Sequence, residues 1–179
     1  MICLFSGGSG SGKSELAEKC AVNLWNKSGK KSEKNSGGLY YYATMRVWDR
    51  EGELRVEKHR KQRAGRGFIT EECPSRLNTQ ITDSVILLEC LSNRLANSMF
   101  SDEDEDPEGV ILNEIYTLSE RNSVVIVTNE IFSDGVEYDP DTERYRMLLG
   151  RLNCKLCRKA ELVVESVYGI PVVHKGEWI

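Results

Sequence analysis

A glycine-rich stretch near the N-terminus has the residue types and the spacing of a phosphate-binding loop. Positions 7 to 14 read GGSGSGKS, which satisfies G-x-x-x-x-G-K-[S/T] at every fixed position. In such a loop the backbone N–H groups point at phosphate oxygens, and the helix that follows adds the positive end of its dipole. We expect Lys13 to reach the outer phosphates and the Ser14 hydroxyl to bind Mg2+. The candidate phosphate-binding residues are Gly7, Gly8, Ser9, Gly10, Ser11, Gly12, Lys13 and Ser14.

Apolar segments on both sides of the loop support this interpretation. Ile2 to Phe5 is a short apolar run, typical of a buried parallel strand. From Ser14 to Trp25 apolar residues recur at the three-and-four spacing of one helix face. The motif requires a strand before it and a helix after it. We therefore favour a phosphate site over a Gly–Ser loop that follows a strand by chance.

Two glutamates that follow apolar runs are candidates for a second metal contact. Glu89 follows Val85 to Leu88, and Glu130 comes soon after Val124 to Thr128. The carboxyl ends of strands face the ligand crevice in doubly wound sheets. Neither residue is the Asp of a Walker B sequence, and each could instead cap its strand in solvent. We favour a metal-binding role for Glu89 and leave both readings of Glu130 open.

A basic run from Arg55 to Arg63 contains His59, one of two histidines in the chain. A neutral imidazole is a competent nucleophile near neutral pH, because its ordinary pKa is about 6.5. Cations beside it would offset the charge of a triphosphate and favour the unprotonated ring. These cations are Arg60, Lys61 and Arg63. A solvated basic helix face is the alternative interpretation of this run.

The elements that position these residues alternate between strand and helix. Besides the first strand and helix, we expect strands at Leu39–Ala43, Phe68–Thr70, Val85–Leu88 and Val124–Thr128, and a terminal hairpin of Leu162–Tyr168 and Val172–His174 with its turn at Gly-Ile-Pro. Helical spacing marks Arg46–Arg63, Leu91–Phe100, Val110–Leu118 and Tyr145–Ala160. The pattern predicts an α/β fold, a P-loop NTPase-like three-layer sandwich with a mostly parallel sheet, helices on both faces and a C-terminal antiparallel hairpin. We expect residues 1–179 to form a single domain.

Three polar or cysteine-containing stretches receive the simpler of two interpretations. Asn26 to Gly38 is rich in Ser, Gly and Lys and reads as a mobile connector rather than a phosphate-binding patch. Asp102 to Asp106, DEDED, reads as a solvated loop rather than a metal site. Cys154 and Cys157 form a lone pair within a helical pattern, so we expect packing rather than zinc or redox chemistry.

Composition excludes several classes of protein. The chain has 179 residues, with 24 Lys+Arg against 28 Asp+Glu and a net charge of -4, which disfavours a nucleic acid partner but not a mononucleotide. Its apolar runs fall short of the roughly 20 residues that a membrane span needs. The N-terminus lacks a secretory signal pattern, and 6 cysteines are too few for a disulfide scaffold. We expect a cytoplasmic protein.

Besides the phosphate loop, six ordered segments resemble one enzyme family. They are Tyr42–Thr44, R-V-x-x-H-R-x-x-R at 55–63, Thr70–Cys73, Ile86–Cys90, Val127–Glu130 and Gly150–Asn153. With them the chain resembles, from Ile2 to about Lys175, the bifunctional adenosylcobinamide kinase/adenosylcobinamide-phosphate guanylyltransferase of cobalamin assembly. The chain departs from the family's usual pattern after Arg63, where it reads AGRG, and after Glu130.

The resemblance implies two reactions. ATP or GTP first phosphorylates the aminopropanol hydroxyl of adenosylcobinamide. GMP from GTP is then carried on a histidine, with release of pyrophosphate, to the cobinamide phosphate, giving adenosyl-GDP-cobinamide. His59 matches that histidine, and Lys13 is the second catalytic candidate. The resemblance also implies a homotrimer, and it places near the nucleotide Ala43, Thr44, Met45, Arg60, Lys61, Gln62, Arg63, Glu72 and Glu89.

Two other functions remain open from the sequence. An ordinary small-molecule kinase would use the same loop without a covalent intermediate and would not need His59. A non-catalytic guanine-nucleotide-binding protein is the other alternative. The chain lacks the Asp-x-x-Gly and Asn-Lys-x-Asp elements that regulatory GTPases use, which argues against that alternative.

Overall fold

The computed structural model describes residues 1–29, 37–46, 50 and 65–178. Its strands form one sheet in the order β3-β2-β4-β5-β1-β6-β7. All neighbours pair in parallel except β6 and β7, which are antiparallel. The strands are β1 (Ile2–Ser6), β2 (Leu39–Ala43), β3 (Ile69–Glu72), β4 (Val85–Glu89), β5 (Ser123–Val127), β6 (Leu162–Val167) and β7 (Ile170–Lys175).

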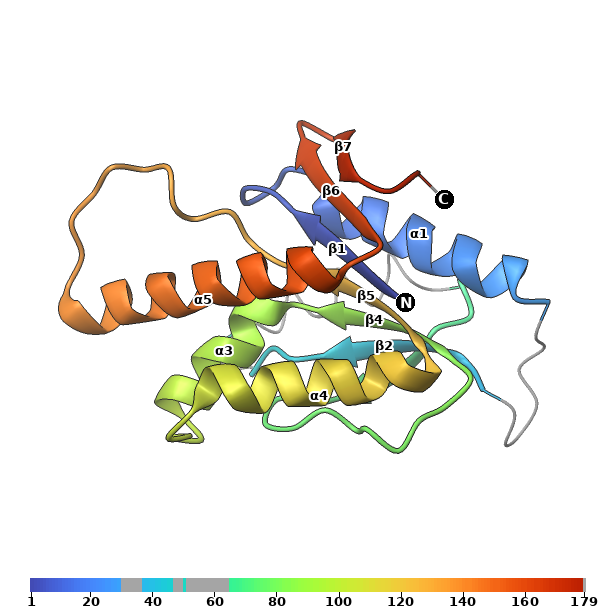
Figure 1. The fold of residues 1–179 in the computed structure, drawn as a ribbon, viewed down its shortest axis with the longest axis horizontal. Helices are drawn as coiled ribbons and strands as arrows, with labels where there is room; N and C mark the ends of the chain where they lie inside the picture. The colour runs from blue at the N-terminus through green and yellow to red at the C-terminus, as the bar shows by residue number, and fades with distance from the viewer. Residues whose placement is uncertain (30–36, 47–49, 51–64, 179) are drawn as a thin grey trace.

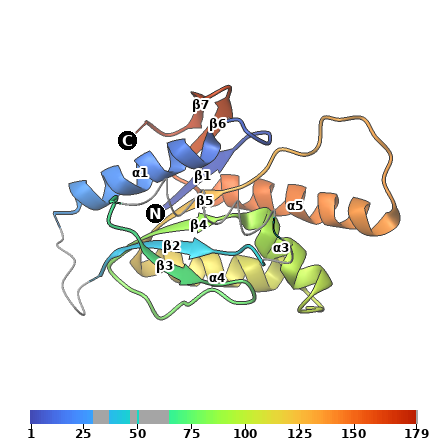
Figure 2. The ribbon, with the colours of Figure 1, turned by 180° about the vertical axis from the view of Figure 1, so that it is seen from behind.

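Helices cover both faces of this sheet, as the sequence predicts. The helices are α1 (Lys13–Lys27), α3 (Leu91–Phe100), α4 (Pro107–Arg121) and α5 (Pro140–Lys159). Figures 1 and 2 show α1 on one side of the sheet, and α3, α4 and α5 on the other. The three-layer α/β fold with a mostly parallel sheet is therefore confirmed.

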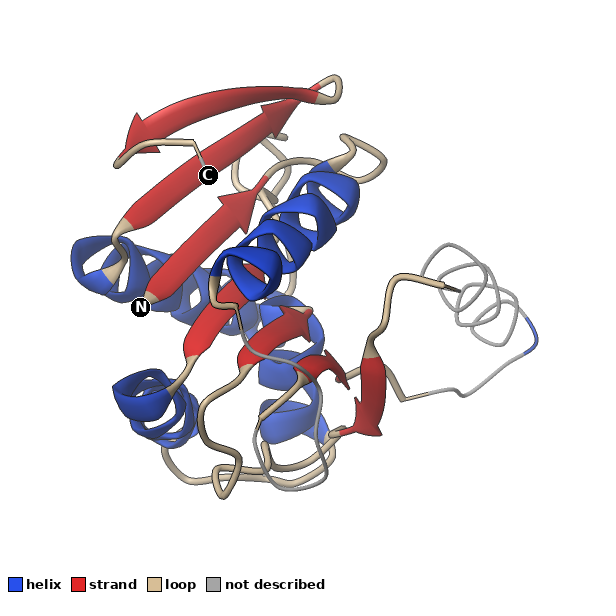
Figure 3. Ribbon diagram, turned by 90° about the vertical axis from the view of Figure 1, so that its right-hand side faces the viewer, coloured by secondary structure: helices blue, strands red, loops and turns tan. Residues whose placement is uncertain are grey.

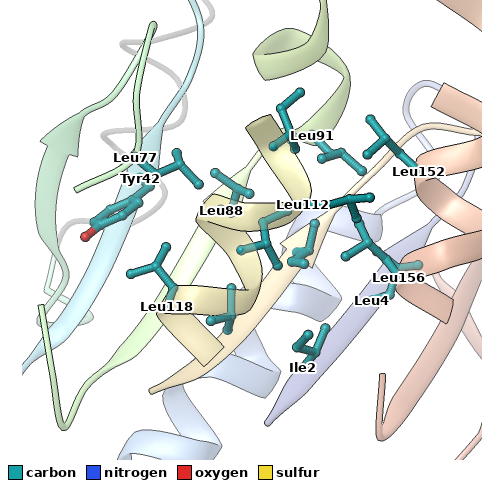
Figure 4. Close-up of a cluster of buried hydrophobic side chains, with 14 of the residues drawn as sticks. Ile2, Leu4, Tyr42, Leu77, Leu88, Leu91, Leu112, Leu118, Leu152 and Leu156 are labelled. Atoms are coloured by element: carbon teal, nitrogen blue, oxygen red, sulfur yellow. The ribbon is translucent and has the colours of Figure 1, made fainter. Parts of the chain in front are cut away.

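The central strands are buried on both faces because apolar residues occupy successive positions along them. Cys3, Val125 and Leu87 face the cluster under α1, whereas Leu4 and Leu88 face the larger cluster under α3, α4 and α5. Figure 4 shows that larger cluster, in which the labelled side chains of α4 and α5 converge on β1 and β4. Burial at about 25 cal/mol per Å2 of apolar surface holds the helices against the sheet.

The C-terminal hairpin is confirmed, but its turn differs from the expected one. Tyr168 and Gly169 make the turn, with φ angles of 51° and 81°. Positive φ at both positions is the geometry of the two-residue turns that suit twisted hairpins. Pro171, which we expected in the turn, lies within β7 opposite Ser166. A proline is tolerated there because β7 is the edge strand.

The acidic stretch from Asp102 to Asp106 is only partly the solvated loop that we expected: Glu103, Glu105 and Asp106 are exposed, but Asp102 and Asp104 are partly buried. Asp102 pairs with Arg46 at 2.5 Å, and Asp104 pairs with Arg76 at 2.6 Å. Asp106 caps α4 by accepting a hydrogen bond from the Gly109 N–H at 3.0 Å. The prediction of a solvated loop was wrong for Asp102 and Asp104. It assumed that a stretch without basic neighbours in the sequence also has none in space.

Three other expectations have mixed outcomes. The helix expected at Arg46–Arg63 and the connector at Asn26–Gly38 lie largely or partly outside the described residues. Cys157 is half-buried against the core, but Cys154 is exposed, so the packing interpretation was wrong for Cys154.

Among the described residues, no helix is long and apolar enough to cross a membrane.

Strand register brings the candidate site residues to one edge of the sheet. Ala43 of β2 lies between Glu72 of β3 and Glu89 of β4, and Glu89 lies beside Val127 of β5. Val127 in turn pairs with Phe5 of β1, two residues before Gly7. The parallel strands all end at this edge. The loop after β1, Glu72 and Glu89 therefore share it (Figure 3). The edge is the place where a sheet of this kind binds ligands.

Candidate active site

The phosphate loop connects β1 to α1 through a backbone path that requires glycine. A Cβ on Gly7 would lie 2.8 Å from the carbonyl oxygen of Ser166, which is backbone and cannot swing away. Gly12 precedes α1 with a left-handed φ of 87°, a conformation that other residues adopt at a cost. Gly12 supplies no side-chain cap to α1, so the first N–H groups of the helix are left for a ligand.

Lys13 is held beneath the loop. Its side chain is largely buried, at 8% relative exposure, and its Nζ donates to the carbonyl oxygen of Gly8 at 3.0 Å. Burial lowers the pKa of Lys13, while the negative charges of Cys90 and Glu89 would act in the opposite direction. The largely buried ammonium group of Lys13 is therefore an electrostatic partner for phosphate oxygens.

The two candidate glutamates behave differently. The Oε2 atom of Glu89 is buried and has no hydrogen-bond partner among the described residues. The Oε1 atom of Glu130 accepts from the Phe132 N–H and the Ser133 hydroxyl, both at 2.9 Å, and so closes its own turn. A buried polar atom without a partner calls for a ligand or an ion. The structure therefore favours Glu89 over Glu130 as the site carboxylate.

Mg2+ fits the oxygen donors at this place. Mg2+ prefers oxygen ligands and is commonly held by one or two protein groups together with substrate phosphates. Ser14, in the first turn of α1, and Glu89, at the end of β4, supply a hydroxyl and a carboxylate. Within the described residues no group of three or more His, Cys, Asp or Glu side chains could hold a metal by itself. This composition suits a cation that arrives with a nucleotide.

Thr44 ties the ends of two strands together. Its hydroxyl donates to the Cys90 carbonyl oxygen at 2.9 Å and accepts from the Cys90 N–H at 2.8 Å. Asn97 of α3 donates to the Thr44 carbonyl oxygen at 2.8 Å. Thr44 is fully buried, so its side chain fixes the geometry of the edge around Ala43 and Met45.

Five predicted site residues lie outside the described residues: His59, Arg60, Lys61, Gln62 and Arg63. The described residues on both sides of them are held by ion pairs. Arg46 donates to Asp102 at 2.5 Å and to Ser75 at 2.6 Å. Arg66 pairs at 2.5 Å with Glu18 of α1, whose side chain is only 4% exposed.

Several side-chain contacts at this edge could not be predicted from the sequence, although Asn129 lies in a segment that resembles the family. Asn129 donates to Ser92 at 2.6 Å, and the Tyr145 hydroxyl donates to the Ser92 carbonyl oxygen at 3.2 Å. The Ser166 hydroxyl donates to the Ser11 carbonyl oxygen at 2.6 Å. These are single polar residues at the ends of distant elements, and only the tertiary structure brings them together.

Comparison with known proteins places this geometry in a family. The family described as "Cobinamide kinase / cobinamide phosphate guanyltransferase" matches residues 3–174. The chain belongs to this family. The resemblance inferred from the ordered segments is thus confirmed, and the phosphate loop and the edge glutamates are features of an enzyme in a family of kinases and guanylyltransferases.

Curated relatives support the same assignment over nearly the whole chain. The "Bifunctional adenosylcobalamin biosynthesis protein CobU" of Salmonella typhimurium is 30% identical over 98% of this chain and 100% of its own length. The CobU protein of Escherichia coli is also 30% identical, over 98% of this chain and 100% of its own length. The CobP protein of Pseudomonas aeruginosa, with the same bifunctional description, is 28% identical over 97% of each chain.

Proposed function

We propose that this enzyme phosphorylates adenosylcobinamide with ATP or GTP, and then transfers GMP from GTP to the cobinamide phosphate through a guanylylated His59. The observation that supports it most is the phosphate loop between β1 and α1, with the largely buried Lys13 at its end and Glu89 at the same edge of the sheet. Family membership supplies the substrate class. The proposal includes the cytoplasm as the place of action, because the sequence lacks a secretory signal pattern, and a homotrimer as the assembled form, by resemblance to the family.

In the phosphorylation step, the loop holds the triphosphate while the acceptor hydroxyl attacks its terminal phosphorus. The bond from that phosphorus to the β–γ bridging oxygen breaks, the nucleoside diphosphate leaves, and the proton of the hydroxyl is released to water. The N–H groups of the loop and of the first turn of α1 point at the phosphate oxygens. Lys13 offsets the negative charge that builds up on the bridging oxygen and the outer phosphates. Ser14 and Glu89 would hold Mg2+, and the ion would supply charge neutralisation for the phosphates.

In the guanylyl step, a ring nitrogen of His59 attacks the α-phosphorus of GTP. A P–N bond forms, the bond from the α-phosphorus to the bridging oxygen breaks, and pyrophosphate leaves. A phosphate oxygen of the cobinamide phosphate then attacks the same phosphorus and frees the histidine. The basic residues around His59 in the sequence support this role, because they would favour the neutral ring and attract GTP.

Covalent labelling tests the guanylyl step directly. We expect GTP labelled at the α-phosphate to label the enzyme, with a bond that is labile in acid and stable in alkali, as a phosphoramidate is. His59→Ala should abolish the label. His174→Ala is the matched control, because His174 is exposed and its Nε2 lies 2.9 Å from Glu165 on the hairpin.

Chasing the labelled enzyme with cobinamide phosphate should move the label to the product. Equal labelling of the wild-type enzyme and His59→Ala would refute the assignment of the nucleophile. Phosphoryl transfer to cobinamide without any covalent label would instead select a kinase that uses the same loop alone.

A further inference from the structure

Ser166 stands where the pattern of β6 calls for an apolar residue. Leu162 and Val164 are buried in the cluster under α1, and Ser166 is the next residue on the same face of the strand. It is only 3% exposed. Burying a hydroxyl costs free energy unless it makes a hydrogen bond, so the partner of this hydroxyl indicates its role.

The backbone of Ser166 lies against the start of the phosphate loop. Ser6 of β1 pairs with Glu165 of β6, so the next residues of the two strands, Gly7 and Ser166, also come close together. The carbonyl oxygen of Ser166 would lie 2.8 Å from a Cβ on Gly7. Figure 3 shows β6 beside β1, the strand that begins at the N label. Strand pairing therefore fixes Ser166 beside the loop.

The side chain of Ser166 reaches the other end of the loop. Its hydroxyl donates to the Ser11 carbonyl oxygen at 2.6 Å, and the Gly169 N–H of the following turn donates to the same oxygen at 2.7 Å. A carbonyl oxygen has two lone pairs, so these two donors satisfy it fully. The Ser11 carbonyl is thus held toward the β6–β7 turn.

Holding this carbonyl also fixes the direction of the next N–H group. The C=O of Ser11 and the N–H of Gly12 belong to one planar trans peptide, so they point in opposite directions. The Gly12 N–H therefore points away from the β6–β7 turn, and it makes no hydrogen bond within the part of the chain that the structure describes. In a glycine-rich loop that leads into a helix, such N–H groups bind phosphate oxygens.

The glycine at position 12 makes this restraint useful. Gly12 has a φ of 87°, and glycine adopts positive and negative φ about equally readily. A change of φ there would turn the Ser11–Gly12 peptide over and bring the Ser11 carbonyl oxygen toward the phosphates. That oxygen carries a negative partial charge and would repel them, whereas an N–H group attracts them. Fixing the carbonyl against β6 therefore keeps the loop in its phosphate-binding form.

We infer that Ser166 is a positioning residue for nucleotide binding: its hydroxyl keeps the Ser11–Gly12 peptide turned so that the Gly12 N–H meets a phosphate of the bound triphosphate. This inference rests on the proposed function, because that triphosphate is the substrate of the proposed reactions. Ser166 acts through the loop and touches no substrate itself. Its effect is on the phosphates, so it is the same for ATP and GTP.

Calorimetric titration of the full chain with GTP, ATP and inorganic tripolyphosphate, in buffer that contains Mg2+, tests the inference. Ser166→Ala removes the hydroxyl and leaves the Gly169 N–H in place, so the free enzyme should melt close to the wild type. We expect this variant to bind all three ligands about 3- to 10-fold more weakly, by the same factor for each. Ser166→Thr keeps the hydroxyl on a residue that suits a strand, and it should bind like the wild type.

Ser119→Ala is the matched control. The Ser119 hydroxyl also donates to a carbonyl oxygen, that of Tyr116 at 2.8 Å, but it lies on α4 beside Met1, at the other end of β1 from the loop. This variant should leave all three affinities unchanged. Wild-type affinities in Ser166→Ala, or a loss confined to GTP and ATP, would overturn the positioning role, as would the same loss in Ser166→Thr or in Ser119→Ala.

The wild-type enzyme separates this inference from the proposed function. A wild-type chain that binds GTP but takes up no label from its α-phosphate would refute the proposed guanylyl step, and the affinities of the Ser166 variants would still decide the role of Ser166. A wild-type chain that binds neither GTP nor tripolyphosphate would overturn both.

Discussion

The phosphate loop at 7–14 and the acidic loop at 102–106 are both short and polar, but their geometry has different origins. The phosphate loop follows from local sequence, because its glycines permit the path and its neighbours form the strand and the helix that it joins. The acidic loop depends on partners far away in the chain: Arg46, Arg76 and Arg94 surround Asp102 and Asp104. We propose that the first loop binds the phosphates of a nucleotide, whereas Asp102 and Asp104 of the second loop are paired within the protein.

The contrast shows how buried charge is used in each region. Lys13 is buried, and among the described residues only the Gly8 carbonyl oxygen accepts a hydrogen bond from it, so the ammonium group keeps electrostatic capacity for a phosphate. Arg94 is fully buried, but Glu114 receives two of its hydrogen bonds at 3.2 Å, and the Arg94 Nη1, which has no hydrogen bond among the described residues, lies 3.9 Å from the Asp102 carboxylate. A buried charge that is paired within the protein fixes the structure, and one that is incompletely paired is available for binding.

The largest effect on folding is expected at the centre of the acidic network. Glu114→Ala leaves the fully buried Arg94 without its closest acid, so the free energy of unfolding should fall by about 3–5 kcal/mol. Urea unfolding measures the change. Glu120→Ala, which removes an exposed acid from the same helix, should change stability by less than about 0.5 kcal/mol. Equal effects of the two variants would show that the network contributes nothing specific.

The phosphate loop should give the opposite result. Lys13→Met keeps the aliphatic stem but removes the ammonium group, so phosphoryl transfer should slow by about 100-fold or more. Thermal stability should stay the same or rise, because the buried cation is desolvated in the native state. Lys19→Met is the control, since Lys19 is an exposed partner of Glu15 on the same helix. A large loss of stability in Lys13→Met would remove the distinction between the two loops.

A smaller effect is expected where the acidic loop meets α4. Asp106→Ala removes the side-chain cap of the helix and should reduce the free energy of unfolding by about 1 kcal/mol. Thermal or urea unfolding can resolve this change. Glu105→Ala alters the exposed neighbour and should have almost no effect. If both variants lose equal stability, general charge rather than capping is responsible.

The smallest effect should appear as a pH dependence. The hydrogen bond from Arg76 holds the pKa of Asp104 below its ordinary value of 3.8, and Ser98 adds to this. Because the folded pKa is depressed, Asp104 stabilises the fold at neutral pH, and this contribution disappears as pH falls through the folded pKa. Asp104→Asn should therefore be less stable than the wild type near neutrality, by less than about 1 kcal/mol, and the difference should close in acid. Unfolding curves measured across the acid range would contradict the pairing if the difference stayed constant.

Local pattern was sufficient for most elements of the fold. The bounds of β2 and α3 agree with the predicted ones, β1 and β4 differ from them by one residue at one end, and β5 is shifted by one residue at both ends. The reason is that buried strands are short apolar runs and a helix face repeats every three or four residues. The hairpin turn was misplaced because Pro171 looks like a turn residue, while an edge strand can accept it.

For the candidate site, the sequence by itself determined the phosphate loop and the glutamate at the end of β4, because each depends on residues close together in the chain. It also determined the resemblance to the family, which depends on the order of several short segments and not on their contacts. The tertiary structure decided the rest. It showed that Glu89 has a buried oxygen without a partner and that Glu130 closes its own turn. It paired the acidic loop with distant arginines. It also placed Gly169 of the β6–β7 turn against Ser11, which is 158 residues away in the chain (169 minus 11). Such contacts depend on strand order and helix packing, which the spacing of residues along the chain does not encode.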